Sequence, residues 1–229
     1  MYNDTVPVIT LDGPSGTGKG TICQLLAKHL KWNMLDSGAI YRVLAYAARK
    51  NKIDFHDVEQ LTALARSLNL RFVSSDDYGT QTILDEEDIS SAIRSEQCGQ
   101  DASQIAAIHE VRQALLERQR NFAQPPGLVT DGRDMGTVVF PTAILKIFLY
   151  ANEAERANRR YLQLKEKGIN VSLAQVVEEL AKRDVRDTGR AHAPLKPADD
   201  AVQIDTTSLS IVQVFNIVLE LMKERMHNV

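Results

Sequence analysis

The segment Gly13-Pro14-Ser15-Gly16-Thr17-Gly18-Lys19-Gly20-Thr21 carries the strongest structural signal in the chain. An apolar, β-branched run from Val6 to Leu11 precedes it, and helical periodicity runs from Lys19 to Leu30. The glycines can adopt positive φ, which lets backbone N–H groups face an anion, and the start of the helix adds partial positive charge. Lys19 supplies a full charge for the β- and γ-phosphates of a nucleotide. The segment therefore predicts a phosphate-binding loop between a buried strand and a helix.

The residues after the lysine bear on the Mg²⁺ ion that accompanies a nucleoside triphosphate. Gly20 follows Lys19 and Thr21 comes only then, so the loop resembles those of nucleoside monophosphate kinases more than those of GTPases. The metal ligand stays open between Thr21 and Asp131, directly or through water. Two short GTPase-like patterns, 51–54 and 76–79, stand in the wrong order along the chain. We interpret the first as a helix-ending loop and the second as a turn.

Strand-like and helix-like segments alternate around the loop. A second strand is expected at 32–35, a second helix at 38–50, and further core strands at 128–130, 144–149 and 201–204. This alternation predicts an α/β fold, with a parallel-sheet core that has helices on both faces. Ser210 starts a terminal helix, whose inward-facing residues are expected to be Ile211, Val214, Phe215, Val218 and Met222.

Two segments interrupt the alternation. Asp57 starts a helix that ends at Leu68, and the runs 70–74 and 80–84 with turn residues between them predict a β-hairpin, hence a small antiparallel sheet. One helix is expected from 96 to 123. A second interruption has helix-start signals at Asn152 and Ser172 and predicts a polar helical hairpin. We expect a single domain over 1–229, with an insertion over about 37–110 and a helical hairpin over about 152–191.

Composition and charge exclude several classes of protein. The chain has 229 residues, 44% hydrophobic and 25% charged residues, and a net charge of −3, which argues against a general nucleic-acid binder. Cys23 and Cys98 lie far apart without metal-ligand spacing, so neither a disulfide framework nor a zinc site is expected. No apolar run approaches the length of a membrane span, and residues 1–4 do not resemble a signal peptide. We expect a cytoplasmic protein that binds neither nucleic acid nor membrane.

Four further motifs accompany the phosphate loop. They are Asp36-Ser37-Gly38-Ala39-Ile40-Tyr41-Arg42, the pair Ala102-Ser103-Gln104 and Val111-Arg112, Asp131-Gly132-Arg133-Asp134-Met135-Gly136-Thr137, and Arg183-Asp184-Val185-Arg186-Asp187-Thr188-Gly189-Arg190. In combination the chain resembles the bacterial cytidylate kinases over nearly its whole length. The resemblance implies a P-loop kinase core, a monophosphate-binding insertion and a helical lid. It also implies a monomer that uses ATP and Mg²⁺ to phosphorylate CMP or dCMP.

The resemblance assigns roles to the residues that match the family's motifs. Catalytic roles fall to four cationic side chains, and the donor ATP is held by the phosphate loop and one lid arginine. The catalytic residues are Lys19, Arg133, Arg183 and Arg190; the ATP contacts are residues 13–21 and Arg159; the acceptor contacts are Ser37, Arg42, Ser103, Arg112, Arg133, Asp134, Arg183, Asp187 and Arg190.

Several alternatives stay open at this point. The acceptor could be another small molecule such as UMP, or the protein could be a nucleotide-dependent switch. A carboxylate at 134 accepts a hydrogen bond from the cytosine N4 amino group, which predicts a preference for CMP, but Asp134 could instead cap the segment after its strand. Arg183 and Asp187 could also form a simple i,i+4 helix pair. Which of Arg156, Arg159 and Arg160 contact the donor stays undecided, although Arg159 is the one named as an ATP contact.

Overall fold

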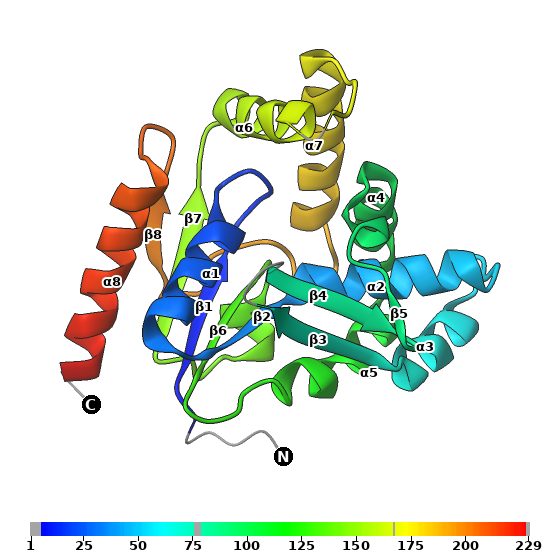
Figure 1. The fold of residues 1–229 in the computed structure, drawn as a ribbon, viewed down its shortest axis with the longest axis horizontal. Helices are drawn as coiled ribbons and strands as arrows, with labels where there is room; N and C mark the ends of the chain where they lie inside the picture. Colours follow the sequence, from blue (N-terminus) through cyan, green and yellow to red (C-terminus); the bar gives the residue numbers. More distant parts are fainter. Residues whose placement is uncertain (1–5, 76–78, 167, 228–229) are drawn as a thin grey trace. The chain divides into compact units, whose positions relative to one another are not determined.

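The computed structural model describes residues 6–75, 79–166 and 168–227 (Figure 1). The chain divides into two compact units. We call Ser37–Arg118 the insert unit, and Met1–Asp36 together with Gln119–Val229 the core unit. Each unit has a sheet of its own, and each is described by itself below.

The core unit is built on a five-stranded parallel sheet of order β2-β6-β1-β7-β8. The strands are β1 (Val8–Asp12), β2 (Asn33–Asp36), β6 (Leu128–Gly132), β7 (Leu145–Tyr150) and β8 (Val202–Asp205). Helices α1 (Lys19–Leu30) and α8 (Ile211–His227) share one hydrophobic core with this sheet, in which Ile22 and Val218 pack with Leu11 and Ile147. The predicted α/β class with a parallel core sheet is confirmed.

Two details of the core unit differ from expectation. Ile211, expected to face inward, is 38% exposed at the start of α8, whereas Val214, Val218 and Met222 are buried. A π-helical turn, η2 (Met135–Val139), follows β6 directly, and the local pattern gave no signal for it. The turn matters because Arg133 and Asp134 lie between β6 and η2.

The helical hairpin of the core unit consists of α6 (Glu153–Glu166) and α7 (Leu173–Thr188). Both predicted helix starts are present: the Asn152 side chain accepts from the backbone N–H of Glu155 at 2.7 Å, and Ser172 forms a capping box with Gln175. Ala157, Leu164 and Val176 form a small core between the helices. This core is separate from the main core around the parallel sheet.

The insert unit combines helices with a three-stranded antiparallel sheet of order β3-β4-β5. Strands β3 (Leu70–Ser75) and β4 (Gly79–Leu84) confirm the predicted hairpin, and the short strand β5 (Glu87–Asp88) adds a third member. The turn predicted at 76–79 falls on residues 76–78, which lie outside the described residues. The remaining elements are α2 (Ser37–Lys50), α3 (Val58–Ser67), η1 (Ala92–Arg94), α4 (Glu96–Ile105) and α5 (His109–Arg120), whose end belongs to the core unit.

The prediction of a single helix from 96 to 123 was wrong, because this segment forms two helices, α4 and α5. Short-range bonds close the end of α4: the N–H of Ala107 donates to Gln104 O at 3.2 Å and that of Ile108 to Ile105 O at 3.0 Å. The Arg112 guanidinium then donates to the carbonyl of Ala106 at 3.1 Å. Helix ends leave such carbonyls without partners, so a side chain from the next helix stabilises the break.

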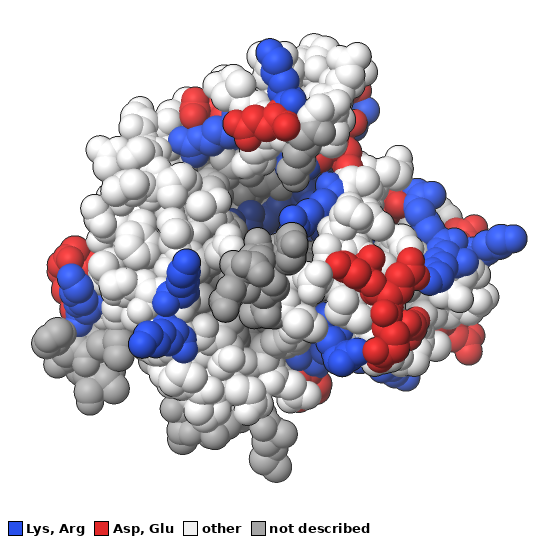
Figure 2. All heavy atoms as spheres, in the orientation of Figure 1, with Lys and Arg blue, Asp and Glu red and all other residues white. Residues whose placement is uncertain are grey.

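Charged side chains of both signs are scattered over the face shown in Figure 2, and acidic ones gather near β5. Glu86 and Glu87 are exposed there and pair with Arg71 and Lys50, each at 2.7 Å. Such exposed pairs contribute little to stability. Within the described part of the chain, no helix has the length and apolar character needed to cross a membrane.

Candidate functional site

The phosphate loop lies between β1 and α1, as predicted. Gly13, Gly16 and Gly18 all have positive φ, and Gly18 is the left-handed residue at which α1 begins. A side chain at Gly13 is excluded, since its Cβ would lie 2.0 Å from the carbonyl oxygen of Leu149. Lys19 is buried, and its Nζ donates to Pro14 O at 3.1 Å across the loop. The backbone therefore wraps around the lysine as a phosphate cradle requires.

The charge of Lys19 is poorly compensated. Burial, followed by the positive charge of Arg133, lowers the pKa of its ammonium group to about 7, although the charge of Asp131 opposes the shift. Cations held together in this way favour the binding of an anion that carries several charges.

Arg133 connects the phosphate loop with the end of the helical hairpin. Its guanidinium donates to Gly13 O at 2.9 Å and to Ser15 Oγ at 2.8 Å, and its Nε donates to Asp187 at 2.7 Å. Asp187 also pairs with Arg190 and, at 3.9 Å, with Arg183. The structure thus brings together the predicted residues Lys19, Arg133, Arg183, Asp187 and Arg190 within the core unit.

Asp187 is ionised because of these arginines. Burial alone would raise its pKa, but the charges of Arg133, Arg190 and Arg183 lower it to about 2. One carboxylate therefore holds three guanidinium groups in place, and their positive charge exceeds its negative charge. The i,i+4 contact with Arg183 is the longest of the three. The shorter contact with Arg133 links Asp187 to a segment far away in the sequence.

Two carboxylates lie at the carboxyl end of the parallel sheet, beside the phosphate loop. Asp36 and Asp131 are register partners on β2 and β6, and Oδ1 of Asp131 is buried without a hydrogen-bond partner among the residues the structure describes. Burial, followed by the charge of Asp36, raises the pKa of Asp131 to about 8.

This donor set fits Mg²⁺, which in nucleotide sites takes one or two carboxylates and completes its shell with phosphate and water. Groups of three or more His, Cys, Asp or Glu that could hold a metal do not occur within 6–75, 79–166 and 168–227. Thr21, the other predicted ligand, is exposed on α1. The site is therefore suited to a metal that arrives with the nucleotide.

Asp12 is a site residue that the sequence analysis missed. It is the last residue of β1, and its buried carboxylate accepts from the backbone N–H groups of Met135 at 2.9 Å and Gly136 at 2.8 Å. Asp134, predicted to bind cytosine, lies buried directly before these two residues. The only available signal was an acidic residue at the end of an apolar strand, immediately before Gly13.

The three arginines of α6 have distinct surroundings. Arg156 is buried, donates to Ser15 O at 3.2 Å and pairs with Asp184 at 2.6 Å, so it joins α6, α7 and the phosphate loop. Arg159 donates to Thr206 O at 2.6 Å, just after β8, and pairs with Glu155. Arg160 donates to Gln163 on its own helix. Only Arg156 among the three hydrogen-bonds to the phosphate loop in the contacts described above.

The insert unit carries four predicted acceptor residues. Ser37 is buried at the start of α2, and Arg42, one turn later, donates to Ile93 O at 3.0 Å. Ser103 on α4 and Arg112 on α5 are buried. The Arg112 guanidinium also lies 5.6 Å from the centre of the Tyr41 ring on α2. The predicted residues are thus supported by three helices of this unit.

Comparison with known proteins gives a consistent result. Residues 9–224 match the model of the family described as "Cytidylate kinase". The chain is 54% identical over 222 residues to the cytidylate kinase of Shewanella denitrificans, with 96% of this chain and 98% of the relative covered. It is 57% identical over 221 residues to that of Stutzerimonas stutzeri, with 96% of each covered. This chain belongs to the cytidylate kinase family. The resemblance predicted from its motifs is confirmed.

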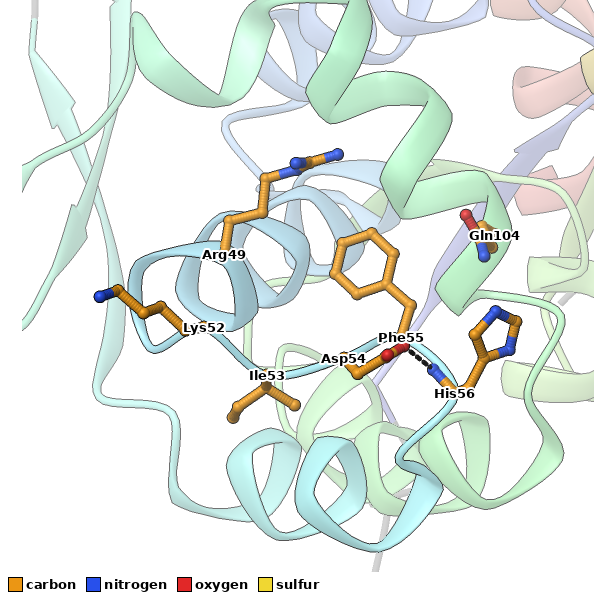
Figure 3. A pocket seen from close by; sticks show the side chains of 7 residues that line it. All are labelled: Arg49, Lys52, Ile53, Asp54, Phe55, His56 and Gln104. Atoms are coloured by element: carbon orange, nitrogen blue, oxygen red, sulfur yellow. Dashed lines mark hydrogen bonds between the residues drawn. The ribbon is translucent and has the colours of Figure 1, made fainter.

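A pocket of about 480 Å³ lies elsewhere on the insert unit (Figure 3). It is at the C-terminal end of α2, roughly 18 Å along that helix from Ser37. Arg49 borders it but already binds Asp101 and lies 5.5 Å from the Phe55 ring centre, while Asp54 accepts from the N–H of His56. The pocket contains none of the predicted site residues; its lining is Arg49, Lys52, Ile53, Asp54, Phe55, His56 and Gln104.

Proposed function

We propose that the protein transfers the γ-phosphoryl group of ATP to CMP or dCMP, giving CDP or dCDP. The observation that carries this proposal is the position of Arg133. Its guanidinium bonds both to the phosphate loop and to Asp187, which lies among the arginines expected to bind the acceptor. These contacts support a role for Arg133 between the donor and acceptor phosphates.

The chemistry needs positioning and charge stabilisation more than a base. The acceptor is a phosphate monoester with a second pKa of about 6, so it is largely a dianion at neutral pH. ATP, CMP and Mg²⁺ together leave a net charge of about −4. Lys19, Arg133, Arg183 and Arg190 of the core unit and Arg42 of the insert unit supply the opposite charge and would stabilise the transferring phosphoryl group.

Asp131 would hold Mg²⁺, directly or through water, with Thr21 as the other candidate ligand. When bound, the ion neutralises charge on the β- and γ-phosphates. Residues 13–21 and Arg159 are assigned to ATP. The proposed phosphoryl transfer requires no histidine to accept or donate a proton.

We assign the acceptor's phosphate, sugar and base to separate residues. Ser37 and Arg42 would bind its phosphate, and Asp187 its sugar. Ser103, Arg112 and Asp134 would read the base, because a carboxylate accepts from the N4 amino group of cytosine whereas uracil presents a carbonyl there. Accordingly the insert unit is the monophosphate-binding insertion, and residues 152–191 form a lid. Action as a monomer in the cytoplasm stays a prediction.

A coupled assay of ATP with CMP, dCMP, UMP, AMP and GMP tests this function. We expect CMP or dCMP to give the highest kcat/KM. Replacing Asp134 with Asn should reduce the preference for CMP over UMP about tenfold or more, since a mispaired buried polar group costs about 1–3 kcal/mol. The exposed Asp199→Asn serves as the control and should leave the preference unchanged. A wild-type enzyme that uses UMP and CMP equally would contradict the proposal.

A further inference from the structure

The carboxylate of Asp12 makes an unusual pair of contacts. Asp12 is 5% exposed at the end of β1, and each of its oxygens accepts one backbone N–H from the start of η2, Oδ1 from Met135 and Oδ2 from Gly136. Hydrogen bonds to a charged acceptor are stronger than neutral ones. Two consecutive N–H groups of the turn η2 therefore donate to one side chain of strand β1.

These contacts enclose the predicted base-recognition residue. Asp134 lies between Arg133, which donates to Gly13 O at 2.9 Å, and Met135, which donates to Asp12. The neighbouring residues Asp12 and Gly13 thus bind the chain on both sides of Asp134. The backbone of Asp134 has φ −144° and ψ 25°, which belongs to neither a helix nor a strand, so no regular element fixes its direction.

Close packing leaves the turn little freedom to adopt another position. A Cβ atom at Gly136 would lie 2.9 Å from Thr10 Oγ1 on β1, so the turn rests directly on this strand. Burial raises the pKa of Asp12 to about 6, while the two N–H groups oppose that shift. An asparagine at position 12 could accept only one of these N–H groups, and its own NH₂ would face the other.

We propose that Asp12 is a positioning residue that sets the direction of Asp134 and through it the preference for cytosine over uracil. Asp12 itself contacts no nucleotide in this proposal. The inference rests on the proposed function, in which Asp134 reads the base. According to this proposal, strand β1, which leads into the phosphate loop, also fixes the position of residues 132–136, the base-recognition segment.

The test is the kinetics of Asp12→Asn with CMP, UMP and ATP. We expect the KM for CMP to rise about tenfold and the ratio of kcat/KM for CMP over UMP to fall about tenfold, because one hydrogen bond is lost and one buried donor is left facing another. The KM for ATP should change less than about twofold, since the phosphate loop keeps its own bonds. Ile9→Val, a change at a buried position of the same strand whose side chain packs in the main core away from the turn, is the control and should keep the wild-type preference for CMP.

Asp12→Ser provides a second variant, which is smaller and keeps one acceptor. A wild-type CMP preference in either folded variant would overturn the proposal. A fall of kcat/KM by the same factor for CMP and UMP would overturn it too, because the preference would be unchanged. If neither variant folds, the proposal also fails, because Asp12 would then act in folding alone. Failure of the proposed function is distinguishable, since wild type and Ile9→Val would then also fail to prefer CMP.

Discussion

Asp187 shows how one side chain organises a positively charged site. It contacts Arg133 from the segment after β6, Arg190 from the segment after α7, and Arg183 from α7 itself. The carboxylate is 1% exposed, and the arginines hold its pKa at about 2. A phosphate that joins this cluster adds a second anion to a group that already has excess positive charge.

The low pKa of Asp187 predicts a pH-dependent contribution to stability. Because the folded-state pKa lies below the ordinary value of 3.8, ionised Asp187 stabilises the fold fully above about pH 4. This contribution, about 2 kcal/mol, is lost as the pH falls from about 4 toward 2. Asp187→Asn should therefore be less stable than wild type at pH 7, and the difference should shrink below pH 4.

Urea unfolding at pH 7, 4, 3 and 2.5 measures that difference. Asp199→Asn is an exposed control that should unfold like wild type at each pH. A deficit of Asp187→Asn that stays constant from pH 7 to pH 2.5 would show that the carboxylate's charge does not stabilise the fold.

At the scale of elements, α6 packs closely against the phosphate loop. Gly16 has φ +83°, and a Cβ atom there would lie 2.9 Å from both Cβ and the carbonyl oxygen of Arg156. The Arg156 side chain in turn bonds to Ser15 O and to Asp184 on α7. The first turn of α6 and the phosphate loop are therefore packed together, and we expect a change in this packing to weaken ATP binding.

Gly16→Ala tests this packing, with Gly168→Ala as a matched control. Both glycines have positive φ, but nothing lies within 4 Å of a Cβ at Gly168. The two variants share a conformational penalty of about 1 kcal/mol, and only Gly16→Ala adds a steric one of about 1–3 kcal/mol. We expect Gly16→Ala alone to raise the KM for ATP, by about tenfold. Equal KM values for the two variants would contradict the packing argument.

The sequence predicted those elements whose signals are local. Periodicity and caps located α1, α6 and α7, and turn residues located the β3–β4 hairpin, because these signals depend on neighbours within a few residues. The break between α4 and α5 and the turn η2 were not predicted. Arg112 stabilises the first and Asp12 the second, through contacts made only in the folded chain.

The residues of the candidate site likewise fall into those that the sequence predicted and those that it did not. The phosphate loop follows from glycine spacing and its strand–helix context. The other predicted residues came from motifs of a family, and in the core unit the structure gathers four of the charged ones, Arg133, Arg183, Asp187 and Arg190, beside Lys19 of the loop. The positions of Asp12 and Arg156 depend on tertiary packing, so a linear pattern could not assign them.

At the scale of the whole molecule, the proposed reaction requires two nucleotides to be shielded from water, since an open site would let water replace the acceptor. The segments that flank the helical hairpin are the expected hinges. They are residues 151–152 and 189–193, and Ala193 already has a positive φ of 51°. Both segments lie outside helices and strands.

Amide hydrogen exchange measures the expected closure. With CMP and a nonhydrolysable ATP analogue together, exchange at 151–152 and 189–193 should be slower than with either ligand alone, because closure restrains both hinges. The buried face of α8 around Val214 and Val218 serves as an internal reference and should not change. Identical exchange at the hinges in all states would argue against lid movement.

The lowered pKa of Lys19 has a thermodynamic consequence for the donor. Burial and the positive charge of Arg133 disfavour the ammonium form of this lysine and lower its pKa to about 7, so that it loses its charge at a lower pH than an ordinary lysine. A triphosphate in the loop would restore the missing charge by drawing a proton from solution. ATP binding is then proton-linked, and its affinity declines as the solution becomes more alkaline.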